Sequence, residues 1–184
     1  MAGDLCRPCW QRRSASCRDD RQFSGESAPF GGRGTEGGSK KGEQGQAIGR
    51  SRGGRTTKIH ALVDAEGRPH ALLLTGGNVA DITGAAQLLA ATEPFGELIG
   101  DKGYDADHLR AFMASRGTLV VIPNKANRVR RYPFDPEKYK LRNVIERSFG
   151  RIKDFRAIAT RYDKTARNFL AGICLAAAVI WWVN

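Results

Sequence analysis

Apolar side chains are distributed very unevenly along this chain of 184 residues. Roughly the first 55 residues are rich in Gly, Ser, Arg and Gln and contain few aliphatic residues. Such a segment cannot bury enough apolar surface to offset the conformational entropy that folding removes. We therefore expect residues 1–55 to be a largely disordered basic segment, and one compact domain to occupy residues 56–184.

The compact part has the pattern of a mixed α/β domain. Thr57–Asp64 alternates with the period of a strand, and Pro69–Leu74 follows a turn as a returning strand, so the pair predicts a hairpin. Asp81 is expected to cap the first helix. Further strands are predicted at 97–100 and 118–122, and helices at 81–91, 105–116, 136–153 and 165–183.

The stretch before residue 154 places one acidic residue among cations. Four of its residues are spaced three, four and seven positions apart: Tyr139, Arg142, Glu146 and Lys153. This spacing puts all four on one face of a helix. A lone carboxylate on a basic helical face suits a site that holds a metal ion and a phosphate backbone together. The alternative is a solvated amphipathic helix with ion pairs between residues four apart.

A second acidic motif lies upstream, at the end of a predicted buried strand. Asp101 follows Leu98 and Ile99, with Gly100 and Gly103 close by. Small neighbours let a metal ion or a substrate backbone approach. A carboxylate at the C-terminal end of a strand is also a favoured site position in α/β folds. Taken alone, the motif is equally compatible with an ordinary strand-to-helix turn and a capping Asp.

Together the two motifs resemble a known family. The helical set matches, without a gap, the Y-(2)-R-(3)-E-(6)-K signature of insertion-sequence DDE transposases. Asp101-Lys-Gly-Tyr104 is similar to the segment that carries their second catalytic Asp. The resemblance extends from about Gly37 to the C-terminus. Other segments resemble the IS-five-type group of that family: 49–54, 57–64, 74–77 and Asp81.

The resemblance implies an RNase H-like fold, a mixed α/β sheet with flanking helices. It also implies a triad of two Asp and one Glu that binds two Mg²⁺ ions and cleaves and transfers double-stranded DNA at transposon ends. Asp101 and Glu146 would be catalytic metal ligands, since Mg²⁺ prefers carboxylate oxygens and two ions clamp a phosphoryl displacement. Arg142 and Lys153 would contact phosphate, with Tyr139 packing or hydrogen-bonding beside them.

The first Asp of that triad has no clear counterpart. In the family it lies in a strand upstream of the Gly-rich loop, but residues 17–30 show neither alternation nor a β-branched run. Asp19 and Asp20 stand among arginines, with no apolar strand to hold them. We therefore expect the fold to lack its first strand and this copy to be catalytically defective.

Back-translation offers an explanation for the missing Asp. Codons for Arg18 to Phe23 can be written so that a shift of one base reads Val-Met-Ile-Asp-Ser, a hydrophobic strand that ends in Asp-Ser. We hypothesise that residues 1–36 are translated out of frame and that the family frame resumes near Gly37. Codon degeneracy allows other shifted readings, and the alternative is a genuine but divergent basic tail.

The net charge of +11, from 30 basic and 19 acidic residues, indicates a polyanionic partner. Nucleic acid is favoured over the alternative of a merely basic protein. The run Asn124–Tyr132 interleaves cations with polar and aromatic residues and precedes the helix of Glu146. Phosphate contacts there would give salt-dependent affinity without sequence reading. The cations expected to contact DNA are Lys125, Arg128, Arg130 and Arg131.

The cysteines indicate neither a zinc site nor a disulfide. Cys6 and Cys9 lack a second pair, and Cys174 is expected to be a small core residue of an apolar helix. The apolar run Phe169–Val183 is shorter than the ~20 residues that span a bilayer, which favours a packed helix over a truncated membrane anchor. Without a signal-peptide pattern, we expect a location in the bacterial cytoplasm at the nucleoid. No membrane partner is expected, and a homodimer is left open.

Two functions follow from these observations. The first is an insertion-sequence DDE transposase whose present copy is inactive. The second is a non-catalytic basic DNA-binding protein on the same fold. Asp101 and Glu146 favour the first, whereas the absent first Asp favours the second.

Overall fold

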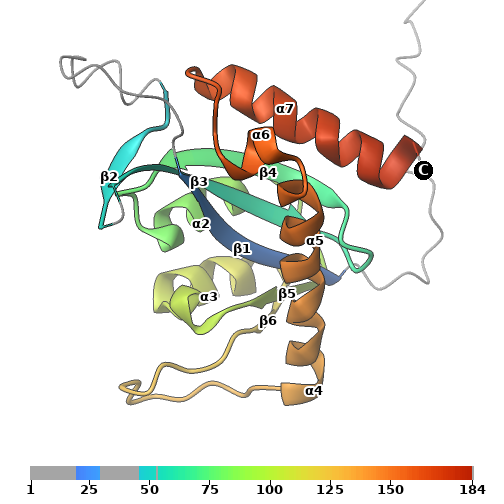
Figure 1. Cartoon of the computed structure of the whole chain (residues 1–184). Helices are drawn as coiled ribbons and strands as arrows, with labels where there is room; N and C mark the ends of the chain where they lie inside the picture. Colours follow the sequence, from blue (N-terminus) through green and yellow to red (C-terminus); the bar gives the residue numbers. More distant parts are fainter. Residues whose placement is uncertain (1–19, 30–45, 53, 184) are drawn as a thin grey trace, which may run out of the picture.

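The computed structural model describes residues 20–29, 46–52 and 54–183. These residues form one six-stranded sheet with helices on both faces (Figure 1). The expected disorder of residues 1–19 and 30–45 lies outside the described part. The strands are β1 Asp20–Pro29, β2 Gly49–Ser51, β3 Gly54–Val63, β4 Pro69–Gly76, β5 Glu97–Gly100 and β6 Leu119–Val121.

The sheet is mixed, as the sequence predicts. Its order is β2-β3-β1-β5-β6, with β4 also paired to β3. Strand β3 runs antiparallel to β1, β2 and β4, while β5 runs parallel to both β1 and β6. The predicted hairpin and the strand at 97–100 are confirmed, and the strand predicted at 118–122 is shorter by one residue at each end.

The expectation that the first strand is missing is wrong. Strand β1 lies in the middle of the sheet, where it pairs with β3 on one side and β5 on the other (Figure 1). Sheet pairing uses backbone N–H and C=O groups, which every non-proline residue carries whatever its side chain. Backbone pairing with β3 on one side and β5 on the other can therefore hold residues 20–29 as a strand, although their side chains have no strand pattern. Both β1 and β2 fall inside residues 1–55, so that segment is not uniformly unstructured.

Helices cover the two faces separately (Figure 1). On one face lie α2 Asp81–Ala90 and α3 Asp107–Ser115, packed against Leu62 of β3. On the other lie α5 Asn143–Lys153, α6 Arg156–Ala159 and α7 Ala166–Ala178. Alternate residues of β3 supply both cores, because successive strand side chains point to opposite faces.

The helix predicted at 136–153 is present, but it has three parts. These are α4 Pro136–Tyr139, the 3₁₀ turn η3 Lys140–Arg142, and α5. Asp135 caps the start, since its carboxylate accepts from the backbone N–H groups of Glu137 and Lys138, and Pro136 occupies the first turn. The tighter η3 turn lies between Tyr139 and Glu146, so the signature residues do not sit on one regular α-helix.

Two finer expectations are wrong. Asp81 does not cap α2: Ala80 holds the cap position, and the Asp81 carboxylate instead lies 2.9 Å from Lys58 Nζ. Cys174 is exposed and is not a core residue. Helix α7 buries Phe169, Ile173, Ala176 and Ala177, and a residue directly after Ile173 is turned away from that face.

The last helix begins as predicted. The Thr165 hydroxyl accepts from the N–H of Asn168 and caps α7, which continues as the π-helical segment η4 Val179–Val183. Among the described residues, Ala166–Val183 is the one helical stretch long and apolar enough to cross a membrane, and 22% of it is buried. Core helices meet the same criteria of length and composition.

Candidate active site

Asp101 lies directly after β5, at the point where the strand turns into a short 3₁₀ helix, η2 Lys102–Tyr104. Its carboxylate accepts from the N–H of Gly103 and caps η2. Asp101 is half-buried, whereas the strand residues before it are fully buried. The chain thus delivers a carboxylate to the surface at the end of a buried strand, as the sequence predicts.

Glu146 lies in the first turn of α5, with 58% of its side chain exposed. Its Oε1 is 2.5 Å from Nη2 of Arg142, one helical turn earlier. The Arg142 guanidinium in turn lies 5.8 Å from the centre of the Tyr139 ring. Three of the four signature residues therefore form one chain of contacts. Lys153, the fourth, is half-buried at the end of α5.

The segments that carry the two acidic motifs both reach the central strands of the sheet, but Lys138 of α4 bonds Glu97 at the start of β5, the opposite end of that strand from Asp101. The η3 turn, which ends at Arg142, contacts β5, and α5 contacts β1 beside it. However, no group of three or more His, Cys, Asp or Glu within the described ranges is placed to hold a metal ion. Asp64 is engaged elsewhere, because it accepts from the backbone N–H of Glu66 and binds Arg68 in the hairpin turn.

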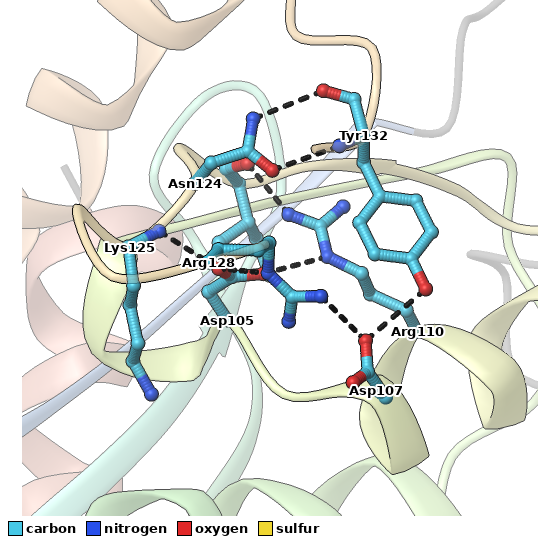
Figure 2. Close-up of polar contacts among 8 residues, drawn as sticks. Asp105, Asp107, Arg110, Asn124, Lys125, Arg128 and Tyr132 are labelled. Atoms are coloured by element: carbon cyan, nitrogen blue, oxygen red, sulfur yellow. Dashed lines mark hydrogen bonds and ion pairs between the residues drawn. The ribbon is translucent and has the colours of Figure 1, made fainter. Parts of the chain in front are cut away.

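A buried carboxylate that sequence reasoning did not single out lies four residues beyond Asp101. Asp105 Oδ1 accepts from Nε of Arg110 at 2.8 Å (Figure 2). Its Oδ2 accepts from Nε of Arg128 at 2.7 Å and from the backbone N–H of Lys125 at 2.8 Å. The Asp105 side chain is 0% exposed. Burial alone would raise the pKa of Asp105, but these three hydrogen bonds outweigh it and lower the pKa to about 2.

The segment that links β6 to α4 is closed on itself by paired hydrogen bonds. Asn124 Nδ2 donates to the Tyr132 carbonyl, and the Tyr132 N–H donates to Asn124 Oδ1, both at 2.9 Å (Figure 2). The Tyr132 ring carries the guanidinium of Arg110 at 4.5 Å and that of Arg128 at 5.0 Å. We call residues 124–132 the basic loop.

The cations of the basic loop separate into two groups. Arg128 is turned inward: its side chain is 10% exposed, and it binds both Asp105 and Asp107. These carboxylates raise the pKa of Arg128 above its usual range. Lys125 and Arg130 are exposed, and they line a hollow of about 460 Å³ together with Asp107 and the inward-turned Arg128. Arg131, next in the chain, is also exposed.

Sequence reasoning missed Asp105 and Arg110, which bond each other five positions apart, because the other partners of Asp105 are distant in the chain. Asp105 stands in the same motif as Asp101, and this proximity was the available signal. Nothing in the spacing indicates that Arg128, 23 positions further on, reaches back to it.

Comparison with solved structures identifies the fold class. The fold is similar to the crystal structure of the catalytic core domain of BIV integrase, with a TM-score of 0.50 and 14% identity. The alignment covers 89% of this chain and 84% of the integrase chain. The RNase H-like fold predicted from the sequence is thereby confirmed.

Sequence comparison identifies the family within that class. Residues 19–181 match the family described as the transposase DDE domain, and the chain belongs to that family. It is 42% identical over 131 residues to a protein named as a transposase for insertion sequence element IS6501, from Brucella ovis. It is 32% identical over 137 residues to one named for insertion sequence element IS402, from Burkholderia cepacia. The alignments cover 98% and 63% of those two relatives.

Proposed function

We propose that this chain is the DNA transposase of an insertion sequence of the IS-five-type group. Its chemistry is metal-dependent phosphoryl transfer, which cleaves DNA at the element ends and joins them to a target. The observation that carries the proposal is the match of residues 19–181 to the transposase DDE domain, on a chain that has Asp101 directly after β5 and Glu146 on a helix that contacts the sheet. Membership of this family supports DNA as the substrate.

Asp101 and Glu146 are the residues that would hold the divalent ions. Both carry hard carboxylate oxygens, the donors that Mg²⁺ prefers, and both reach solvent. Bound ions would stabilise the attacking and leaving oxygens of the phosphoryl group. The protein's own contribution is to fix these carboxylates on a strand end and on a helix, which are rigid supports.

The DNA would lie against the cations around these two acids. Arg142 and Lys153 flank Glu146 on the helical segment, with Tyr139 supporting Arg142 through its ring. Lys125, Arg130 and Arg131 extend the basic surface on the preceding loop. Contacts of this kind are to phosphates, so they give affinity and salt dependence but little sequence selectivity.

We further propose that this copy is catalytically defective because the third carboxylate of the triad is absent. Strand β1 pairs on both edges, and a central strand covered on both faces is normally a continuous apolar run. Here it reads Asp-Arg-Gln-Phe-Ser-Gly-Glu-Ser-Ala-Pro. The shifted reading supplies Val-Met-Ile-Asp-Ser at the same place, which is the composition that such a position requires.

The register of β1 supports that hypothesis independently. The shifted Asp falls at the junction of codons 21 and 22. Gln22 pairs with Ile99 of β5, which ends one residue later, just before Asp101. A carboxylate restored at this position would therefore lie on the strand adjacent to the one that delivers Asp101. The gene sequence across codons 18 to 37 is the direct check, since an intact shifted frame must be present there.

A titration of DNA binding against salt tests the substrate class. The logarithm of the association constant should fall linearly with the logarithm of salt concentration, because counterions are released from each neutralised phosphate. Affinity should differ little between unrelated duplexes. A chain that binds without salt dependence would not be using these cations.

The second candidate is a non-catalytic DNA-binding protein on the same fold. It is favoured by the lack of a three-residue metal-binding group in the part of the chain that the structure describes. Both candidates bind DNA, so a cleavage assay with Mg²⁺ separates them. In either case we propose that the protein works at the nucleoid in the bacterial cytoplasm, and a homodimer is the assembly to test.

A further inference from the structure

We propose that Asp105 is a positioning residue, which fixes the basic loop onto the strand end that carries Asp101. The DNA-contacting cations and the metal-ligating carboxylate would then act as one rigid unit. This inference rests on the proposed function, because it concerns how the same site holds DNA. It makes Arg128 an internal anchor and Arg130 a phosphate contact, whereas the sequence predicts both as DNA contacts.

The first support is that both carboxylate oxygens of Asp105 are hydrogen-bonded within the protein. Both of its oxygens accept hydrogen bonds, from Arg110, Arg128 and the N–H of Lys125 (Figure 2). A buried charge of this kind is strongly disfavoured unless every bond is made. Opening the loop would strip Asp105 of two of its three partners, so the closed loop is strongly preferred.

The second support is the short, stiff connection between Asp105 and Asp101. The η2 turn lies between them, and its backbone bonds run from the Tyr104 N–H to the Asp101 carbonyl at 3.0 Å and from the Asp105 N–H to the Lys102 carbonyl at 3.2 Å. Any residue bound to Asp105 is therefore held at a fixed distance from Asp101. The basic loop is bound in this way although α3 and β6 lie between it and Asp105 in the chain.

The third support is a brace on the opposite side of the carboxylate. Arg110, on α3, donates from Nε to Asp105 and from Nη2 to the Ile122 carbonyl at 2.8 Å. Ile122 directly follows β6, where the chain leaves the sheet towards the basic loop. The Arg110 side chain is 6% exposed, and its guanidinium lies 4.5 Å from the centre of the Tyr132 ring. The loop is thus held at its base as well as through Arg128.

The consequence for DNA binding is preorganisation. A free loop would lose conformational entropy for each side chain and backbone unit ordered on the DNA, which lowers affinity. Here the bonds of Asn124, Arg128, Tyr132 and the Lys125 N–H already hold the loop before DNA arrives. Arg128 serves as the internal anchor, and Lys125, Arg130 and Arg131 remain on the outside, where phosphates can reach them. Loss of the anchor should therefore weaken DNA binding although Asp105 touches no DNA.

Two matched pairs of substitutions test the proposal on the full chain. Asp105→Asn removes the buried charge, whereas Asp107→Asn removes the other partner of Arg128, whose side chain is 74% exposed. Arg128→Lys and Arg130→Lys both keep the loop charge, but only the first removes a planar guanidinium that bonds a buried carboxylate. Each variant is assayed for affinity to a mixed-sequence duplex, for tryptic cleavage within residues 124–132, and for thermal unfolding.

We expect Asp105→Asn and Arg128→Lys to lower DNA affinity by roughly tenfold or more and to speed cleavage in the loop, while Asp107→Asn stays within about threefold of wild type. Arg130→Lys keeps the charge of an exposed phosphate contact, so it should lower affinity less than Arg128→Lys and leave loop cleavage unchanged. The salt slope should be nearly unchanged in Arg128→Lys, because the exposed cations remain. If Asp105→Asn fails to fold, the comparison of Arg128→Lys with Arg130→Lys still decides.

Equal effects of Arg128→Lys and Arg130→Lys would overturn the proposal, since Arg128 would then be an ordinary phosphate contact. Faster loop cleavage without loss of DNA affinity would overturn it as well. A wild-type chain that binds no DNA would instead refute the proposed function, and this inference would fall with it. If the wild-type chain binds DNA and the Asp105→Asn and Arg128→Lys variants bind it with the same affinity, only the positioning role is refuted.

Discussion

The Oε1 atom of Glu146 lies 2.5 Å from the Nη2 atom of Arg142, so the acidic residue of the signature is held by the signature's own arginine. The pair is one turn apart in the helical segment, with the Arg142 side chain 26% exposed and that of Glu146 58% exposed. A divalent ion that binds Glu146 must compete with this guanidinium. DNA can relieve the competition, because a phosphate offers Arg142 another anion.

A substitution at Arg142 should therefore separate metal binding from DNA binding. In Arg142→Gln without DNA, Mn²⁺ affinity should rise by up to about fivefold, because an exposed ion pair of roughly 0.3–1 kcal/mol no longer competes. DNA affinity should fall, because a phosphate contact is lost. Calorimetric titrations with Mn²⁺ give the first quantity, with Glu146→Gln as the variant that loses the ligand. Weaker Mn²⁺ binding in Arg142→Gln would show that Arg142 instead positions Glu146 for the ion.

Acid should unfold the protein partly through Asp105. Its pKa is lowered to about 2 from an ordinary value of 3.8, so its ionised form stabilises the fold above pH 3.8 and this contribution is lost as the pH falls towards 2. The loss should be on the order of 2 kcal/mol. Denaturant unfolding from pH 6 to pH 2 should show that decline in wild type, and a flatter one in Asp105→Asn. Identical pH dependence in both proteins would contradict the assignment.

Two helical glycines should respond oppositely to alanine. A Cβ at Gly84 of α2 would lie 2.4 Å from Cε1 of His60, a fully buried ring whose Nε2 is 2.7 Å from the Thr75 hydroxyl. Gly84→Ala should therefore lower the free energy of unfolding by about 1–3 kcal/mol. A Cβ at Gly150 of α5 would meet nothing within 4 Å. Gly150→Ala should raise stability by about 0.5–1 kcal/mol, because alanine favours a helix.

Burial also lowers the pKa of His60, whose ring is fully buried and lies within hydrogen-bond distance of the Thr75 hydroxyl. The ring therefore cannot move aside at low cost to admit the Gly84→Ala methyl group. Thermal unfolding of the two alanine variants against wild type is the measurement. Equal stabilities would mean that α2 shifts away from β3 more easily than this packing suggests.

Arg161 should be a major stabilising residue. It is completely buried, its Nη2 donates to the Gln46 carbonyl at 2.7 Å, and it bonds the Thr57 hydroxyl. Its guanidinium also lies 5.0 Å from the centre of the Phe169 ring. Arg161→Met should cost about 3 kcal/mol or more, since hydrogen bonds to a charged group are lost and buried carbonyls stay unsatisfied. Arg167→Met, at an exposed position of α7, should change stability by less than about 0.5 kcal/mol.

The sequence predicted most of the elements whose pattern is local. The hairpin β3–β4, strand β5 and helix α3 each follow from alternation or helical period over their own residues. Strand β1 could not be predicted in this way. Its residues carry no strand pattern, and its place is decided by the backbone pairing that β3 and β5 offer on either side.

The same distinction between local pattern and distant partners applies to the residues of the candidate site. Asp101 and Glu146 could be named because strand-end and helix-face positions are visible in the sequence. Asp105 could not be given a role, because its meaning lies in a partner, Arg128, that the fold brings back from a distant loop. The sequence likewise grouped Arg128 with Arg130 as equal DNA contacts, whereas burial distinguishes them.

The most direct test of the account is a DNA-nicking assay with Mg²⁺ on duplexes that carry the ends of the element. It compares the chain as it stands, a frame-repaired version that restores Ile-Asp-Ser in β1, and the repaired version with Glu146→Gln. The account predicts cleavage by the repaired chain alone, because the two-ion clamp needs all three carboxylates. Robust Glu146-dependent cleavage by the unrepaired chain would contradict it, and would mean that Asp19, Asp20 or Asp64 supplies the third ligand.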